Sequence, residues 1–235
     1  MKNSYKRFAY FYDEVVTSDL NYDLWLEFVE PYLKKGDKIL DLACGSGTFA
    51  TMLKLKGFDS SGLDLSDEII EIANEKKKIN HLDIPFYVMD MTSFNLNEKY
   101  DVITCFFDSI NFLDNKNKIK KMLDTVYKHL NKDGYYIFDI ASKVLLNEYD
   151  HHEFHKDYET FYVDWVSEMI DNDTLCHHIK IKDVDESFEE DYYEYYYNIG
   201  DVLDKRFEII KIVGDFNDDL QDDDERILFV LKKSH

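Results

Sequence analysis

The stretch ILDLACGSGTFA at residues 39–50 joins a short apolar segment to a glycine-rich turn and then to a segment with helical spacing. The first four residues are apolar except for Asp41, as is typical of a strand buried on both faces. Gly45 and Gly47 break this strand, and residues 48–56 have the spacing of a helix. A strand, a glycine turn and a helix in this order predict the first unit of a parallel α/β sheet. Ligands of such sheets bind at the carboxyl ends of the strands.

The same alternation of strand and helix extends over the first 142 residues. Further strands are predicted at 58–63, 85–88, 101–106 and 135–140, and helices at 4–16, 22–34, 67–78 and 116–130. Ser66 is a good N-cap for the helix at 67–78, which has acidic residues in its first turn. The expected fold class is therefore α/β, with a parallel sheet and helices on both of its faces.

The alternation stops after Ala141. Three stretches rich in aromatic and β-branched residues follow, at 160–169, 174–181 and 187–197. Acidic turns separate them, so they predict an antiparallel meander. A short helix at 199–203 and a strand pair at 207–213 and 226–231 complete the chain. We therefore expect one core domain from 1–142 plus 201–235, interrupted by a β-rich insertion at 143–200.

Composition limits the function. The chain has 235 residues, of which 28 are basic and 49 acidic, and its net charge is −21. This charge argues against binding to nucleic acid or to an anionic membrane surface. The start of the sequence lacks the apolar core of a signal peptide, and no apolar run is long enough to span a membrane. Cys44, Cys105 and Cys176 are predicted to be reduced thiols of a cytoplasmic protein.

Two kinds of ligand suit the glycine turn. The segment GSGTFA at 45–50 fits the dinucleotide fingerprint GxGxxG/A, which is a weak signal alone. Three acids at the ends of successive strands favour another ligand. Asp41 suits a cationic amino acid group, although it could also orient the glycine loop. Asp64 suits the two hydroxyls of a ribose, and Asp90 suits the amine of an adenine. Together they indicate an adenosine ligand without phosphates.

With these motifs the sequence resembles the class I S-adenosylmethionine-dependent methyltransferases. The resemblance rests on LDLACGSGTF at 40–49, GLDLS at 62–66, MDM at 89–91 and DVITCFFDSINFL at 101–113. The amino-terminal FAYFYDEV and NYDLW are similar to a subgroup of small bacterial methyltransferases that includes amino-sugar N-methyltransferases. The resemblance implies a Rossmann-like fold with S-adenosylmethionine as cofactor and S-adenosylhomocysteine as product.

The resemblance also implies a set of cofactor contacts. Ala43 and Gly45 would contact the methionyl part through backbone groups, and Phe106 would offer its carbonyl to the amino group. Asp64 would bind the ribose. The adenine would lie against Leu65, Asp90 and Met91, and the aromatic residues Tyr12, Tyr22 and Trp25 would close over the cofactor or simply belong to the core. No metal site is predicted.

The methyl acceptor is less clear from sequence. A small molecule that receives the methyl group on nitrogen or oxygen, by in-line displacement, is the first hypothesis, with the insertion covering its site. The many carboxylates and tyrosines of the insertion suit a neutral or cationic acceptor. A protein or RNA acceptor and a non-catalytic S-adenosylmethionine-binding protein are the alternatives, and Asp41 and Asp90 disfavour a nicotinamide oxidoreductase.

The catalytic residue and the oligomeric state stay open at this stage. Asp108 and the Tyr and His residues of the insertion are candidate proton acceptors, but no spacing singles one out. The histidine-rich segment at 151–155 is interpreted as a solvated loop.

Overall fold

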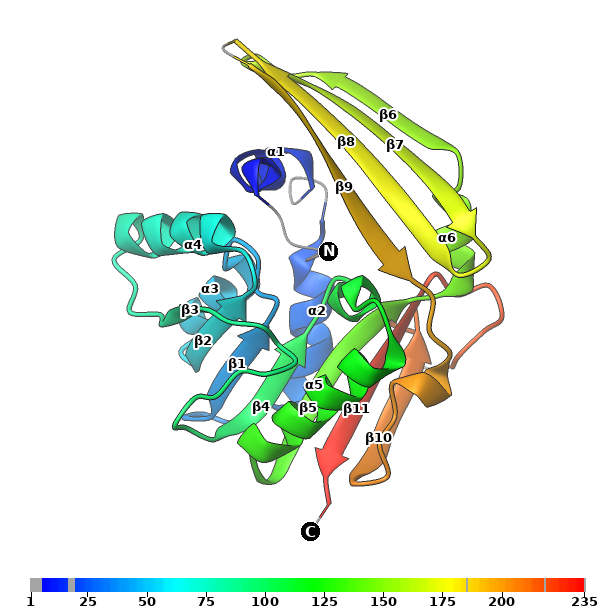
Figure 1. The fold of residues 1–235 in the computed structure, drawn as a ribbon. Coiled ribbons are helices and arrows are strands. Elements are labelled where there is room, and N and C mark those ends of the chain that lie inside the picture. Colours follow the sequence, from blue (N-terminus) through cyan, green and yellow to red (C-terminus); the bar gives the residue numbers. More distant parts are fainter. Residues whose placement is uncertain (1–5, 17–19, 185, 218, 235) are drawn as a thin grey trace.

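The protein contains two sheets. The computed structural model describes residues 6–16, 20–184, 186–217 and 219–234, and its elements are shown in Figure 1. One sheet has seven strands and forms the centre of the molecule, and the other has four strands and stands apart from it. This arrangement confirms the predicted α/β fold with an additional antiparallel sheet.

The seven-stranded sheet has the order β10-β11-β5-β4-β1-β2-β3. Its strands are β1 (Lys38–Leu42), β2 (Asp59–Asp64), β3 (Phe86–Val88), β4 (Tyr100–Cys105), β5 (Leu130–Ala141), β10 (Phe207–Gly214) and β11 (Arg226–Lys233). The pairs from β3 to β5 are parallel, whereas β11 is antiparallel to both β5 and β10. The carboxyl ends of β1 to β5 therefore meet at one edge, where the sequence predicted the ligand.

Helices cover both faces of this sheet, as predicted. The helical elements are η1 (Arg7–Phe11), α1 (Tyr12–Val15), α2 (Tyr22–Val29), η3 (Glu30–Tyr32), α3 (Thr48–Leu55), α4 (Asp67–Ile79), η4 (Ser109–Phe112), α5 (Lys116–His129), α6 (Lys143–Glu148) and η5 (Ile199–Asp201). Residues 4 and 5 of the first predicted helix lie outside the described residues. Ser66 caps α4 by accepting a hydrogen bond from the amide of Ile69 at 3.1 Å.

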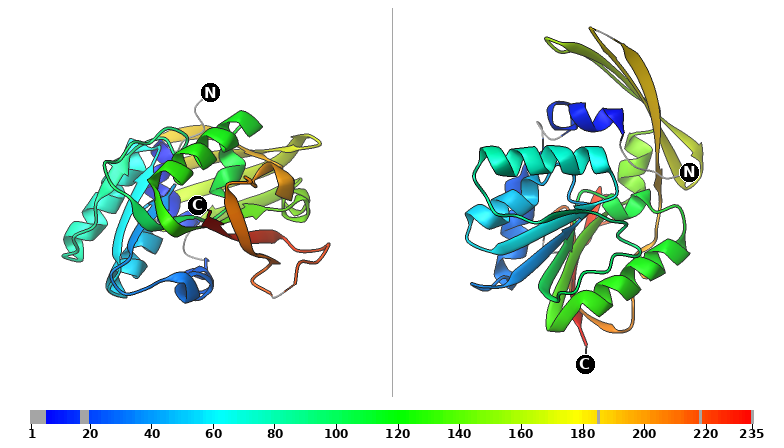
Figure 2. Two further views of the ribbon diagram at one scale, coloured as in Figure 1. Left: turned by 90° about the horizontal axis from the view of Figure 1, so that it is seen from below. Right: turned by 60° about the vertical axis from the view of Figure 1, so that its left-hand side comes forward.

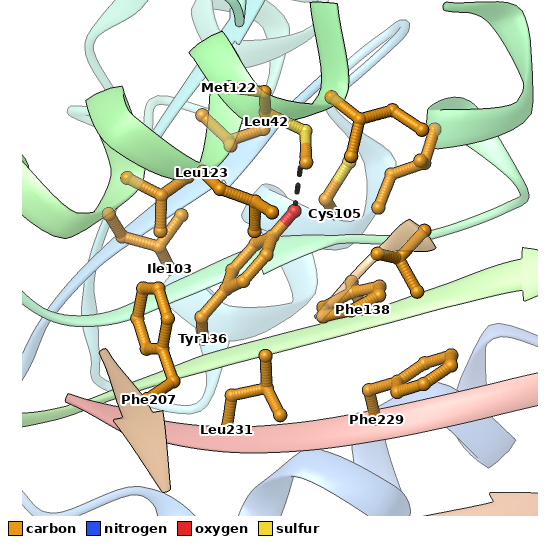
Figure 3. Close-up of a cluster of buried hydrophobic side chains, with 14 of the residues drawn as sticks. Leu42, Ile103, Cys105, Met122, Leu123, Tyr136, Phe138, Phe207, Phe229 and Leu231 are labelled. Carbon is orange, nitrogen blue, oxygen red and sulfur yellow. Dashed lines mark hydrogen bonds between the residues drawn. The ribbon is translucent and has the colours of Figure 1, made fainter. Parts of the chain in front are cut away.

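Two buried clusters hold the helices against the sheet. On one face α5 packs over β5 and β11, where Tyr136 stacks on Phe138 and Phe138 on Phe229 (Figure 3). The Tyr136 hydroxyl donates to Met122 Sδ at 3.5 Å, which satisfies the one polar atom of that ring inside an apolar cluster. On the other face α2 and α3 bury Trp25 and Phe49.

The four-stranded sheet is antiparallel throughout. It consists of β6 (His152–Asp157), β7 (Phe161–Asp171), β8 (Thr174–Asp183) and β9 (Ser187–Tyr195) in that order. The long strands stand over one end of the central sheet, with η1 and α1 lying between them and α4 (Figures 1 and 2). Phe8 of η1 is fully buried and lies 5.9 Å from the rings of both Trp165 and Tyr192. The amino-terminal segment is thus packed on the second sheet.

Three details differ from the sequence prediction. Residues 152–157 form the edge strand β6 and not a solvated loop, although most of their side chains are exposed. An edge strand with one partner has little apolar pattern, so the sequence did not reveal it. β5 begins at Leu130, five residues before its predicted start, because residues 130–134 extend directly from α5. The helix α6 was not predicted.

Among the described residues, no helix is long and apolar enough to cross a membrane. Cys44, Cys105 and Cys176 are all free.

Candidate functional site

A large cavity of about 1510 Å³ lies between the carboxyl ends of the central strands and the inner face of the second sheet. Small-molecule sites usually enclose roughly 300–1,000 Å³, so this cavity has room for more than one small ligand. The central sheet contributes residues that follow β1, β2, β3 and β4, and the second sheet contributes residues of β7, β8 and β9. A ligand held by strand ends would therefore face the second sheet.

The glycine turn after β1 forms one wall of the cavity. Gly47 is the N-cap of α3 and has a φ of +78°, a conformation that side chains rarely adopt. A Cβ atom at Gly47 would lie 2.5 Å from the ring of Phe86, so the turn also packs tightly against β3. Ala43, which comes before the turn, has a positive φ of 51° as well. The tight turn brings the backbone of Ala43 and Gly45 to the cavity surface.

We expect Gly47→Ala to destabilise the protein by roughly 2–4 kcal/mol, because it combines a left-handed backbone with overpacking against Phe86. Gly57→Ala is the matched control. Gly57 has a φ of +93° but nothing within 4 Å of its Cβ position, so only the backbone strain of about 1–2 kcal/mol applies. Urea unfolding of both variants measures the difference. Equal losses would show that Phe86 moves aside without cost.

Asp64 lies at the end of β2 and is fixed by backbone amides. Its Oδ2 accepts from Gly45 N at 3.0 Å, and its Oδ1 accepts from Ser66 N at 3.0 Å. Removal from water raises the pKa of this carboxyl, and hydrogen bonds from the amides of Ser66, Gly45 and Leu65 oppose the rise. Both Asp64 and Leu65 line the cavity. The site thus holds an oriented carboxylate beside the glycine turn.

Asp90 lies two residues beyond β3. Its Oδ1 accepts from Thr92 N at 2.8 Å and from Thr92 Oγ1 at 2.7 Å, which forms a local turn and orients the carboxylate. Asp90 and Met91 line the same cavity as Asp64. β2 and β3 are neighbours in the sheet, so their carboxyl ends place Asp64 and Asp90 side by side at one end of the cavity.

Asp41 is more deeply buried, with an exposed fraction of 3%. Its Oδ1 accepts from Thr104 Oγ1 at 2.7 Å, which ties β1 to β4. Loss of water around the carboxyl raises the pKa of Asp41 to about 7, with a further contribution from the charge of Asp64. Asp41 borders a second cavity of about 30 Å³, which Tyr22 and Phe106 also line.

The two cavities adjoin through shared walls. Tyr12, Ala43, Gly45, Phe107 and Ser109 line both of them. The small cavity therefore lies next to the large one, beside the glycine turn.

Trp25 is the one predicted site residue that lies elsewhere, since it lines neither of these two cavities. It is 5% exposed, and its Nε1 donates to Asp139 Oδ2 at 2.6 Å. Its ring packs on Phe107 with a centroid distance of 4.4 Å. The position of Trp25 suits support of the cavity wall through Phe107 better than contact with a ligand.

The sequence did not reveal a charged cluster at the floor of the large cavity. Arg226, from β11, pairs with Asp108 at 2.8 Å and with the fully buried Asp139 at 3.3 Å. Asp108 N also donates to Asp139 Oδ1 at 2.8 Å. Phe107 and Asp108 both have positive φ, so the chain turns sharply after β4. The sequence marked Asp108 as a candidate proton acceptor. It did not reveal the partner Arg226, because Arg226 is 118 residues away in sequence and belongs to no recognisable motif.

Comparisons with known proteins agree with this geometry. Residues 39–134 match the model of a methyltransferase domain. A protein from Geobacillus sp. (strain WCH70) that is named as a methyltransferase is 33% identical over 144 residues, which cover 59% of this chain and 58% of that protein. The chain thus spans less than two thirds of the length of the curated relatives it matches first.

Solved structures match over a greater length. A crystal structure of a S-adenosylmethionine-dependent methyltransferase from Clostridium acetobutylicum ATCC 824 is 27% identical and covers 97% of this chain and 98% of its own, with a TM-score of 0.83. The sugar N-methyltransferase KedS8 from Streptoalloteichus sp ATCC 53650 is 20% identical and covers 99% and 94%, with a TM-score of 0.78. At 20% identity, the similarity to KedS8 shows a shared fold and no more.

Proposed function

We propose that this chain is an S-adenosylmethionine-dependent methyltransferase that transfers a methyl group to a nitrogen or oxygen of a small-molecule acceptor. The observation that carries the proposal is the large cavity between the two sheets. One end of the cavity has Asp64 and Asp90, which suit the cofactor, and the second sheet forms the wall of the remaining space. A donor and an acceptor could therefore occupy one cavity.

The residues present fit the adenosyl half of the cofactor. Asp64 presents an oriented carboxylate that can accept from both ribose hydroxyls. Asp90, beside it, can accept from the adenine amine, and the Met91 amide can donate to a ring nitrogen. Leu65 offers an apolar surface for the adenine. All four residues border the cavity, which supports their assignment as a nucleoside site.

The methionyl half fits the region around Asp41. A buried carboxylate with few compensating charges attracts an ammonium group strongly. The carbonyl of Phe106 and the backbone of Ala43 and Gly45 are the other polar groups proposed there. Tyr12 and Tyr22 line the same region and would cover the cofactor, while Trp25 would act only through Phe107.

The bound cofactor would supply a methyl group that is already activated for transfer, so the protein would not have to activate the donor. The chain would hold the acceptor in line with that group and exclude water. The packing of Phe8 against the second sheet supports this role, because it places the amino-terminal segment beside the cavity.

A cavity with walls on two sides, from the central sheet and from the second sheet, favours a small acceptor over a protein or RNA. The net charge of −21 also disfavours RNA. KedS8, with the same fold, is named for transfer to the nitrogen of a sugar, which is consistent with a small acceptor. A non-catalytic cofactor-binding protein is less well supported, because the cavity beyond the proposed cofactor site is large.

Calorimetry with S-adenosylmethionine and with NAD tests the cofactor. We expect binding of the first and none of the second, and the reverse result would overturn the proposal. A screen of small amines, alcohols and sugars that measures release of S-adenosylhomocysteine then tests the activity. Activity restricted to protein or RNA acceptors would contradict the small-molecule assignment.

The affinity for S-adenosylhomocysteine should depend on pH through Asp41. Since burial raises the pKa of Asp41 to about 7, its charged fraction falls below that pH and a proton competes with the ligand's ammonium group. We expect the dissociation constant to rise by up to about tenfold for each pH unit below 7. Calorimetry between about pH 5 and 7, where that ammonium group stays charged, measures this rise. The Asp41→Asn variant should bind more weakly with a flat profile, and a flat wild-type profile would contradict the role of Asp41.

A further inference from the structure

The inner face of the second sheet carries a buried polar chain that ends on a carboxylate. Trp165 Nε1 lies 3.1 Å from Ser167 Oγ, and Ser167 Oγ lies 2.8 Å from His177 Nδ1. His177 Nε2 lies 3.0 Å from Glu194 Oε1. These four residues come from β7, β8 and β9, and all of them line the large cavity. The chain is therefore part of the cavity wall opposite the strand ends.

The direction of these hydrogen bonds follows from the chemistry of the groups. The indole of Trp165 can only donate, so it donates to Ser167 Oγ or, at 3.2 Å, to His177 Nδ1. The Ser167 hydroxyl then donates to His177 Nδ1, which leaves the ring proton on Nε2. Nε2 donates to Glu194. The chain thus orients His177 as a donor and Glu194 as an ionised acceptor.

The surroundings of Glu194 make it a stronger base than an ordinary carboxylate. Its side chain is 13% exposed, and that of His177 is 5% exposed. Burial raises the pKa of Glu194, and the charge of Asp108 raises it further. His177 and Arg226 act in the opposite direction. The hydroxyl of Tyr149, the residue after α6, is a further titratable group of this cavity, and its pKa is raised by burial, by Asp108 and by Glu194.

We propose that Glu194 binds the amino group of the methyl acceptor, with His177 as a positioning residue, so that the acceptor is a primary or secondary amine on a compact skeleton. This proposal rests on the function proposed above and names the acceptor class of the same site. A buried carboxylate that a donor chain keeps ionised attracts an ammonium group, whereas a hydroxyl group gains much less. Asp108 adds a second negative charge on the facing wall, which Arg226 partly neutralises.

The same carboxylate suits the proton that the nitrogen has to lose. An ammonium group has no free electron pair, so the N–H bond breaks, its electron pair stays on nitrogen and its proton passes to Glu194. The nitrogen pair then forms the bond to the methyl carbon while the carbon–sulfur bond breaks and leaves its pair on sulfur. The raised pKa of Glu194 brings it closer to the working pH and so favours this transfer.

A test of the acceptor class does not need the natural acceptor. Cyclohexylamine and cyclohexanol have the same skeleton and differ in the group of interest. Each is titrated at neutral pH into the protein saturated with S-adenosylhomocysteine, and the ring nitrogens of His177 are followed by NMR. The His177→Asn variant assigns those signals. We expect the amine to shift them and to bind at least about tenfold more tightly than the alcohol.

The Glu194→Gln variant should lose this preference and keep its affinity for S-adenosylhomocysteine. The matched control is Glu168→Gln on β7. Glu168 is exposed and does not line the large cavity, so its removal should leave the preference unchanged. Equal binding of amine and alcohol, no response of His177, or an unchanged preference in Glu194→Gln would each overturn the proposal.

Two further results separate this inference from the proposed function. If the wild type does not bind S-adenosylhomocysteine, the proposed function itself fails. If it binds and the acceptor screen finds only alcohols or thiols, Glu194 does not select amines and this inference alone fails. With any amine that the screen identifies, Glu194→Gln should recover much of its turnover at high pH, where the free amine is abundant in solution. The same loss at every pH would contradict the proton transfer.

Discussion

The Asp64→Asn variant is expected to bind S-adenosylhomocysteine at least about 100-fold more weakly than the wild type, because hydrogen bonds to a charged group contribute about 1.5–3 kcal/mol each. Asp64 has two proposed tasks. Its oxygens accept from the amides of Gly45 and Ser66 at 3.0 Å, and the same carboxylate faces the proposed ribose. An asparagine side chain has one acceptor oxygen, so it cannot satisfy both amides and also the two hydroxyls.

Calorimetry measures this loss, and Asp90→Asn is a useful comparison. The Asp90 carboxylate accepts from the amide and from the hydroxyl of Thr92, and an asparagine can keep both hydrogen bonds through its oxygen. We therefore expect a loss of about tenfold there, equivalent to one weakened hydrogen bond. A larger loss at Asp90 than at Asp64 would contradict the assignment of Asp64 to the ribose. Thermal unfolding without ligand checks that neither variant has lost its fold.

The fold and the shared position of the proposed cofactor residues could be predicted because their signals are local. The strand, turn and helix around Gly45 and Gly47 are contiguous in sequence. Asp64 and Asp90 each follow a short apolar strand, and parallel strands bring such positions to one edge. Knowing the order of elements therefore places these residues on one wall, and the structure does place both on the cavity surface.

The proposed acceptor end could not be predicted because its residues meet only through tertiary structure. His177 and Glu194 lie in register-paired strands 17 residues apart, and their contact depends on that register. Arg226 reaches the floor of the cavity from the last strand, after an acidic loop. Trp25 shows the opposite difficulty. The helical spacing around Trp25 indicates that it is buried. Only its hydrogen bond to Asp139 shows that the side chain lies behind the cavity wall and not in the cavity.

The Arg226→Met variant should be the most destabilised, with a loss of about 3–5 kcal/mol in the free energy of unfolding, because it leaves buried carboxylates without their cation. Asp139 has no exposed surface, and the side chain of Asp108 is 20% exposed. Methionine fills a similar volume, so the loss reports on charge more than on packing. Urea unfolding measures it. Lys232→Met on the same strand is the control, since its exposed pair with Asp133 is expected to contribute only about 0–1 kcal/mol.

The pH dependence distinguishes charge from packing in this variant. Burial already raises the pKa of Asp139, and Arg226 opposes that rise, so removing Arg226 raises the pKa further. An acid with a raised pKa in the folded state binds more protons there than in the unfolded chain, and stability then falls as pH rises. The deficit of Arg226→Met should therefore narrow as pH is lowered from about 8 toward the unfolded aspartate value of about 4. Arg226→Met combined with Asp139→Asn should recover part of the loss at neutral pH. A deficit that is independent of pH, with no recovery in the double variant, would mean that the Arg226 side chain stabilises the floor of the cavity by packing alone.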